Sequence, residues 1–289
     1  MDYISVFIQM LHARGLADNT IRSYKTYILP YLDFLSGRSL LPEDASWQDM
    51  RDYLAFIQEQ RGLSNRTVNM IISYLQFFQI YVLHKTWDRT QVPFRRFDVY
   101  LPFVPSRALA ADFIRSLDDR KARLAVSILF ATGLRLDELC HLRCCDIYSS
   151  SRKIYVRRSK NHSDRYVPMP DSIWEGILSY WRSLPEDMRS REWLFTQQLS
   201  PGRPMDKQWL QDKIIRQRRR MKIDERLTAH SFRHAFATFS YENGMDLLTL
   251  KAIMGHKSIQ STIRYVHLAA IPPQGIANPF EQSGGGLLV

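Results

Sequence analysis

The stretch ATGLRLDEL at residues 131–139 combines a helix end, a chain reversal and a new helix start. The apolar segment 122–132 has the composition of a buried helix, and Gly133 suits the left-handed cap that ends one. A short helix follows at once and carries Arg135 near its start. A guanidinium beside such a break can point into a cleft and hold two phosphate oxygens. Glu138 shares its helical face and could orient it, although an ordinary surface ion pair is the alternative.

A second segment, HSFRHAF at 230–236, holds His230 and Arg233 three residues apart, so that both face the same side of a helix. We expect them to face one ligand while Phe232, Phe236 and Phe239 turn toward the core.

His230 and His234 also have the spacing of a zinc-binding pair, but the metalloprotease pattern needs a glutamate where Ser231 stands. Cys140, His141 and Cys144 are the other residues that could contribute to a metal site. We expect no metal, and His234 is interpreted as a packing or supporting residue.

A third segment, MGHKSIQSTIRYVHL at 254–268, places His256 directly after a helix-ending glycine and Tyr265 nine residues later. A tyrosine on a late amphipathic helix is usually half-buried packing. A fourth segment, RQRRRMK at 216–222, is strongly basic. Part of it is predicted to contact phosphates, a solvated surface being the alternative; the candidates are Arg216, Arg218, Arg219 and Arg220.

The rest of the chain is predicted to be mainly helical. One β-hairpin is predicted from KIYVRRSK (153–160) and RYVPMP (165–170) around the turn NHSD. In the first hundred residues, we expect glycine and proline to separate the periodic segments rather than interrupt them. The predicted helices cover 18–35, 46–62, 64–82, 112–117, 122–132, 173–181, 207–221, 230–241, 246–254 and 258–268, and residues 86–105 form an extended connector.

The composition limits the function classes. The 289 residues are enough for two domains, and 40 Lys and Arg against 29 Asp and Glu give a net charge of +11, which favours a polyanionic partner. Three cysteines are too few and too close together to cross-link the chain, so a reducing compartment is expected. No signal peptide or bilayer-spanning segment is recognised, and we expect a cytoplasmic protein with no membrane partner.

The order of these motifs resembles that of the tyrosine recombinase, or phage integrase, family, and the nearest type is the compact two-domain Xer type. The resemblance implies a catalytic set of Arg135, Lys160 in the hairpin turn, His230, Arg233, His256 and the nucleophile Tyr265, with Glu138 bracing the first arginine. The turn SKNHSDR departs from the family in lacking glycines around its lysine. Lys153, Arg157 and Arg158 are therefore rivals of Lys160.

The fold implied is mainly α. A helical N-terminal core-binding, SAM-like domain (1–90) is followed by a linker (91–107) and by a mostly helical catalytic domain with a small antiparallel β-sheet (108–270). The tail 271–289 is expected to dock on a neighbouring subunit, a disordered tail being the alternative.

The activity implied is site-specific recombination of double-stranded DNA through a covalent 3′-phosphotyrosine, without metal, ATP or another cofactor, by a tetramer assembled on DNA. Two arginines and a histidine would stabilise the charge on the attacked phosphate. His230 is the candidate base, because a tyrosine with a pKa near 10 needs help to lose its proton; Lys160 would protonate the leaving oxygen, and His256 would bind a phosphate oxygen. A type IB-like topoisomerase acting as a monomer is the alternative. A DNA-binding protein without activity and a metal-dependent nuclease are less well matched.

Overall fold

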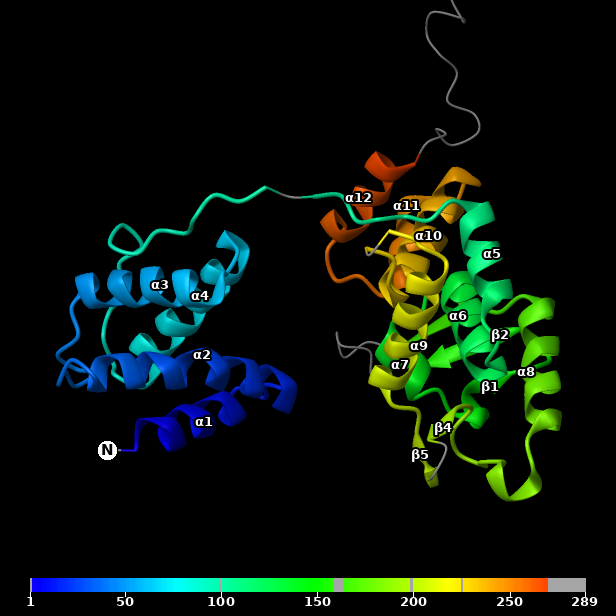
Figure 1. Cartoon of the computed structure of the whole chain (residues 1–289), viewed down its shortest axis with the longest axis horizontal. Helices are drawn as coiled ribbons and strands as arrows, with labels where there is room; N and C mark the ends of the chain where they lie inside the picture. The colour runs from blue at the N-terminus through cyan, green and yellow to red at the C-terminus, as the bar shows by residue number, and fades with distance from the viewer. Residues whose placement is uncertain (1, 99, 158–163, 198–199, 225, 270–289) are drawn as a thin grey trace, which may run out of the picture. The chain divides into compact units, whose positions relative to one another are not determined.

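The computed structural model describes residues 2–98, 100–157, 164–197, 200–224 and 226–269. The chain divides into two compact units, Met1–Tyr100 and Leu101–Val289 (Figure 1). Each unit has a hydrophobic core of its own. Within the described ranges, no helix is both long and apolar enough to cross a membrane.

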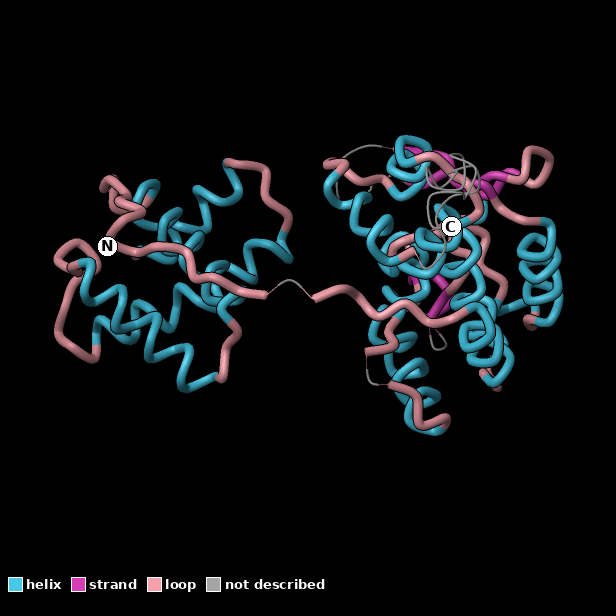
Figure 2. The backbone as a smooth tube through the Cα atoms, turned by 90° about the horizontal axis from the view of Figure 1, so that it is seen from above, coloured by secondary structure: helices cyan, strands magenta, loops and turns pink. Residues whose placement is uncertain are grey.

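The described part of the first unit is built from helices and loops (Figure 2). Asp2, Ser46 and Ser64 cap three of its helices through their side chains. The core is rich in aromatic rings; Phe7, for example, makes an edge contact with Phe78. The helices are α1 (Tyr3–Ala13), α2 (Asp18–Ser36), α3 (Trp47–Arg61) and α4 (Asn65–Tyr81).

Two sequence expectations for this unit need correction. The predicted helices do not include α1, whose apolar pattern is short. Pro30 lies inside α2, not between helices. A proline removes one hydrogen bond from a helix interior, but Ile28 and Tyr31 on either side of it are both fully buried. Packing of this stripe therefore holds α2 together through the proline.

The second unit is organised around α6 (Arg120–Thr132), which packs against α5 (Arg107–Ser116), α8 (Asp171–Ser183) and α10 (Ala229–Glu242). Its buried side chains lie on several faces, as expected of a helix enclosed by others. The remaining helices are α7 (Leu136–Cys140), α9 (Lys207–Arg220), α11 (Leu247–Met254) and α12 (Gln260–Leu268). Short 3-10 turns cover Cys144–Asp146 and Glu186–Met188.

An antiparallel sheet with the order β1-β2-β3 joins β1 (Ile147–Tyr148), β2 (Lys153–Val156) and β3 (Arg165–Pro168). Ile154 pairs with Val167 and Val156 with Arg165. These four side chains are buried, so that one face of the sheet packs on the core. A second pair of strands, β4 (Thr196–Gln197) and β5 (Ser200–Pro204), is separate. The prediction of a mainly α fold with a small antiparallel sheet is confirmed.

Gly133→Ala is expected to lower the free energy of unfolding of the second unit by roughly 2 to 4 kcal/mol. Gly133 has φ +65, and a Cβ there would overlap Phe236 Cδ1 and lie 2.8 Å from its Cε1. Gly244→Ala is the control, because Gly244 also has a positive φ but no atom within 4 Å of the added Cβ. Urea unfolding measures both losses. Equal losses would show that the contact with Phe236 is not what excludes a side chain at 133.

Candidate active site

Arg135 stands at the start of α7 and is fixed on two sides. Its Nη1 donates to Glu138 Oε1 at 2.7 Å, and its Nη2 donates to the carbonyl of Gly255 at 2.8 Å. Its backbone N–H donates to Glu138 Oε2 at 2.8 Å. The predicted support of Arg135 by Glu138 therefore has a geometric basis, and the guanidinium is tied to a residue 120 positions away.

Glu138 also binds a second arginine, Arg165 of β3. Arg165 donates from Nη1 to Oε1 at 3.0 Å and from Nη2 to Oε2 at 2.7 Å. Burial alone would raise the pKa of Glu138, but the hydrogen bonds and charges of Arg165 and Arg135 outweigh it and lower this pKa to about 2. The carboxylate is therefore ionised at neutral pH.

Sequence reasoning missed Arg165. A signal was present in the alternation of RYVP, which places position 165 on the same face of the strand as Val167. That face is the buried one, and a buried arginine needs partners.

Arg233 comes from the first turns of α10 and is only 5% exposed. Its guanidinium donates to the carbonyls of Gly133 and Met254, the latter at 2.5 Å, and lies 3.3 Å from Nε2 of His256. Burial, reinforced by the charge of Arg135, lowers its pKa to about 10. Arg233 thus remains cationic at neutral pH.

His256 follows Gly255, which ends α11 in the left-handed conformation. Its Nδ1 lies 3.0 Å from Thr262 Oγ1 and its Nε2 faces Arg233. Since a guanidinium only donates, Nε2 is the acceptor, and we assign the ring proton to Nδ1. Burial and the charges of Arg233 and Arg135 lower the pKa of His256 to about 3, so the imidazole is neutral. Thr262, fully buried, was not singled out from the sequence.

Tyr265 of α12 lies beside these groups. Its ring is nearly parallel to that of His256, at an angle of 15° and a centroid distance of 6.1 Å. The residue is 1% exposed, and its hydroxyl lies 3.1 Å from Nδ1 of His234. Burial raises the pKa of the phenol, although the charges of Arg233 and Arg264 oppose this. The residue that the sequence offered as packing, His234, is therefore the observed partner of the tyrosine hydroxyl.

His230 lies one helical turn before His234, with ring centroids 6.4 Å apart, and is exposed. Burial and the neighbouring His230 lower the pKa of His234 to about 4. The structure thus brings Arg135, Glu138, Arg233, His256 and Tyr265 into one cluster, named the basic pocket, with His230 next to His234 at its edge.

The tip of the hairpin, with Lys160 and its rival Arg158, lies outside the described residues. Of the other rivals, Lys153 is exposed on β2, and Arg157 is paired with the buried carboxylate of Asp146.

The four candidate arginines of the basic segment of α9 differ in their contacts. Arg218 donates to the carbonyl of Leu227, and Arg220 pairs with Asp118. Arg216 and Arg219 are exposed. Contacts of any of the four with phosphates remain a prediction.

The charge of the basic pocket suits an anion. The guanidinium groups of Arg135 and Arg233, together with that of Arg165 behind them, outnumber the one carboxylate of Glu138, and burial strengthens their field. The phenol of Tyr265 lies within this field. In the described ranges, no three His, Cys, Asp or Glu side chains gather as a metal site requires. The arrangement can bind a phosphate and place a phenol beside it.

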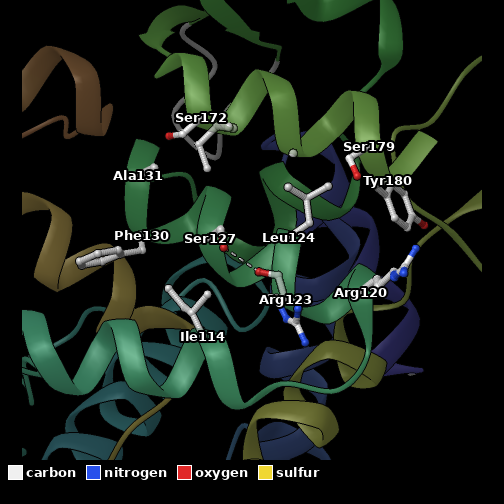
Figure 3. Close-up of a pocket in the computed structure, with 12 residues that line it drawn as sticks. Ile114, Arg120, Arg123, Leu124, Ser127, Phe130, Ala131, Ser172, Ser179 and Tyr180 are labelled. Carbon is white, nitrogen blue, oxygen red and sulfur yellow. Dashed lines mark hydrogen bonds between the residues drawn. The ribbon is translucent and has the colours of Figure 1, made fainter. Parts of the chain in front are cut away.

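A cavity of about 620 Å³ lies elsewhere in the same unit, between α5, α6 and α8 (Figure 3). Leu124, Ser127 and Tyr180 are among the side chains that line it, and Ser127 donates to the carbonyl of Arg123. None of the predicted catalytic or DNA-contacting residues is among the described residues of its lining. The cavity is therefore separate from the basic pocket.

Acid is expected to destabilise the second unit well above the pH at which carboxylates titrate. The pKa of His256 is about 3 in the folded state against 6.5 for a free histidine. The unfolded chain therefore binds more protons between these values, and stability is lost as pH falls below 6.5. For His256 alone the loss between pH 6.5 and 4.5 is roughly 2 kcal/mol.

Urea unfolding at pH 7.5, 5.5 and 4.5 measures this loss. His256→Gln should flatten the dependence, and His141→Gln, at a half-exposed histidine outside the pocket, should not. Identical slopes for all three proteins would contradict the burial of a neutral His256.

Two family models match the chain. The model of the phage integrase family matches residues 108–270, and that of the N-terminal SAM-like domain of phage integrases matches residues 4–89. The resemblance drawn from the motifs is thereby confirmed.

Individual relatives cover almost the whole chain. Tyrosine recombinase XerA of Pyrococcus furiosus is 28% identical, over 93% of this chain and 90% of its own, and XerD of Rhizobium meliloti is 27% identical, over 92% and 90%. A crystal structure of XerA recombinase aligns with a TM-score of 0.52 at 25% identity, over 93% of this chain and 94% of its own. The Tn1549 transposon integrase in complex with a circular intermediate DNA aligns at 0.72 and 19% identity, over 92% and 94%, a likeness of fold.

Proposed function

The chain belongs to the phage integrase family, and from this membership and the basic pocket we propose how the protein breaks and rejoins DNA. It is a tyrosine-type site-specific recombinase, an enzyme that exchanges DNA strands by transesterification. The assignment of residues rests on one observation: His256 lies against both Arg233 and Tyr265. Arg135, paired with Glu138, lies behind them.

In the proposed reaction the oxygen of Tyr265 attacks a backbone phosphorus. The bond from phosphorus to the 5′-oxygen breaks, and a 3′-phosphotyrosine and a free 5′-hydroxyl result. The proposed base is His230, which takes the phenol proton, and the proposed acid is Lys160, which supplies a proton to the leaving oxygen. The 5′-hydroxyl of another strand then reverses the step and joins new partners, so that the bond energy is conserved without a nucleotide.

The positive groups stabilise the transition state in this proposal. Charge develops on the nonbridging oxygens of the attacked phosphate, and donors fixed in advance stabilise it without having to reorganise. Arg135 and Arg233 are held by backbone carbonyls, which supports this role. For His256 to donate to a phosphate oxygen, as proposed, its ring proton must move from Nδ1 to Nε2 when the phosphate binds, and Nδ1 then accepts from the hydroxyl of Thr262.

The phenol already has a hydrogen-bond partner in this structure. Tyr265 is buried, and its hydroxyl is engaged with His234. Binding of DNA must therefore replace this hydrogen bond by one to the phosphate or the base before attack. We assign His234 the part of holding the hydroxyl until then.

DNA is the partner of this protein. We propose that it binds double-stranded recombination sites, assembles as a tetramer on DNA and acts in the cytoplasm. The proposed docking of residues 271–289 on a neighbour concerns a segment outside the described residues. Relatives that are integrases and recombinases favour recombination over the topoisomerase alternative.

Capture of covalent adducts on host DNA tests this function and identifies the target sequence in the same experiment. The protein is mixed with fragmented DNA of its own host, denatured with detergent in the presence of a chelator, and the attached DNA is sequenced. Recombination predicts a small set of shared sites, and two copies of such a site should yield recombinant joints. Attachment throughout the genome, together with relaxation of plasmids that lack a site, would favour the topoisomerase instead.

A further inference from the structure

Arg165 lies behind the basic pocket and connects two of its parts, the pair of Arg135 with Glu138 and the turn that carries His256. The side chain is 7% exposed. Its donors reach Glu138 and the carbonyl of Ile253, at 2.6 Å from Nε. Because β3 pairs with β2 through Val156, the guanidinium extends from a fixed strand.

The first link runs to Arg135. Both carboxylate oxygens of Glu138 accept from Arg165 in a parallel, two-point pair, which fixes the plane of the carboxylate. The same oxygens accept from the side chain and backbone of Arg135. The plane set by Arg165 therefore determines where the guanidinium of Arg135 points.

The second link runs to His256. The carbonyl of Ile253 is held by Arg165, and a Cβ on Gly255 would come within 2.9 Å of Arg165 Nη1. The guanidinium thus lies against the backbone turn that carries His256. The carbonyl of Gly255 is in turn the second acceptor of Arg135.

We infer that Arg165 is a positioning residue for DNA cleavage, which sets Arg135 and His256 together without contacting DNA itself. This inference rests on the proposed function of the basic pocket. The competing explanation is a buried ion pair that serves stability alone. The two differ in one respect, because a positioning residue acts on the cleavage rate through Arg135.

Arg165→Lys keeps the charge and removes the two-point geometry. At saturating DNA, with a site found by adduct capture, the single-turnover rate of adduct formation should fall about 10- to 100-fold. The dissociation constant for DNA should change less than about twofold, since Arg165 does not contact phosphate. Arg123→Lys is the matched control, because Arg123 donates twice to the carbonyl of Leu117, outside the pocket. This variant should form the adduct at the rate of the wild type.

A double-mutant cycle with Arg135→Lys decides between the two explanations. In the Arg135→Lys background, Arg165→Lys should lower the rate of adduct formation less than about threefold, because the residue through which Arg165 acts is already impaired. The full 10- to 100-fold loss in both backgrounds would overturn the inference, as would a lower melting temperature with an unchanged rate, or an equal loss in Arg123→Lys.

Arg165→Met replaces Arg165→Lys in the same cycle if the lysine variant does not fold, because it fills a similar volume without a charge and leaves the direct bonds between Glu138 and Arg135 in place. It should show the same dependence on Arg135, and a fully additive loss would again overturn the inference. Failure of the proposed function is distinguishable, since the wild type would then form no adduct.

Discussion

Tyr265→Phe is expected to abolish the covalent protein–DNA adduct, with a loss of at least about 10³-fold in cleavage rate. The change removes the one oxygen that is proposed to attack the phosphate. The ring remains to pack against Ala237, Leu250 and Met254. Since the only described hydrogen bond lost is that to His234, stability should fall by about 1 kcal/mol and DNA binding should persist.

Denaturing gels of protein trapped on a nicked suicide substrate measure this loss. Tyr241→Phe is the matched control, because Tyr241 packs on the same small core and has no proposed role. It should form the adduct at the rate of the wild type. A Tyr265→Phe protein that folds, binds DNA and still forms the adduct would exclude Tyr265 as the nucleophile.

Arg233→Lys is expected to have the second largest effect, a fall of about 10²- to 10³-fold in the single-turnover cleavage rate. The guanidinium of Arg233 reaches two backbone carbonyls and the ring of His256 at once. A lysine ammonium is a single point on a flexible stem and cannot keep these contacts and also bind a phosphate in two places. The positive charge remains, so affinity for DNA should change much less than the rate.

Single-turnover cleavage and a binding titration at fixed salt separate these two quantities. Arg189→Lys is the control, since Arg189 donates to the carbonyl of Leu184, which belongs to none of the pocket motifs. Equal losses of affinity and rate in Arg233→Lys would mean that Arg233 binds DNA but does not stabilise the transition state.

Local sequence features predicted much of the helical framework. Ser46 and Ser64 cap helices as expected, and Gly133 and Gly255 end helices in the left-handed conformation. These features depend on neighbours in the sequence, which a single sequence displays. The expectation that proline lies between the helices was wrong for Pro30. The hydrogen bond that it removes from α2 is offset by packing that the sequence does not display.

The contacts within the site were less accessible to prediction. The motifs offered candidates for the family's catalytic set, but they did not show that the hydroxyl of Tyr265 is bound by His234. Arg165 was missed because its partner, Glu138, is distant in the sequence. Thr262 was missed because nothing in the sequence shows that it faces His256. Only the folded chain brings β3, α7 and the turn after α11 together.

Mass spectrometry of the trapped adduct tests the central claim most directly. After nuclease digestion and proteolysis, the account predicts that the peptide containing Tyr265 carries a nucleotide joined through a 3′-phosphate, and that the peptides with Tyr241 or His256 carry none. A nucleotide on another residue, or an adduct that forms only with added metal, would contradict it.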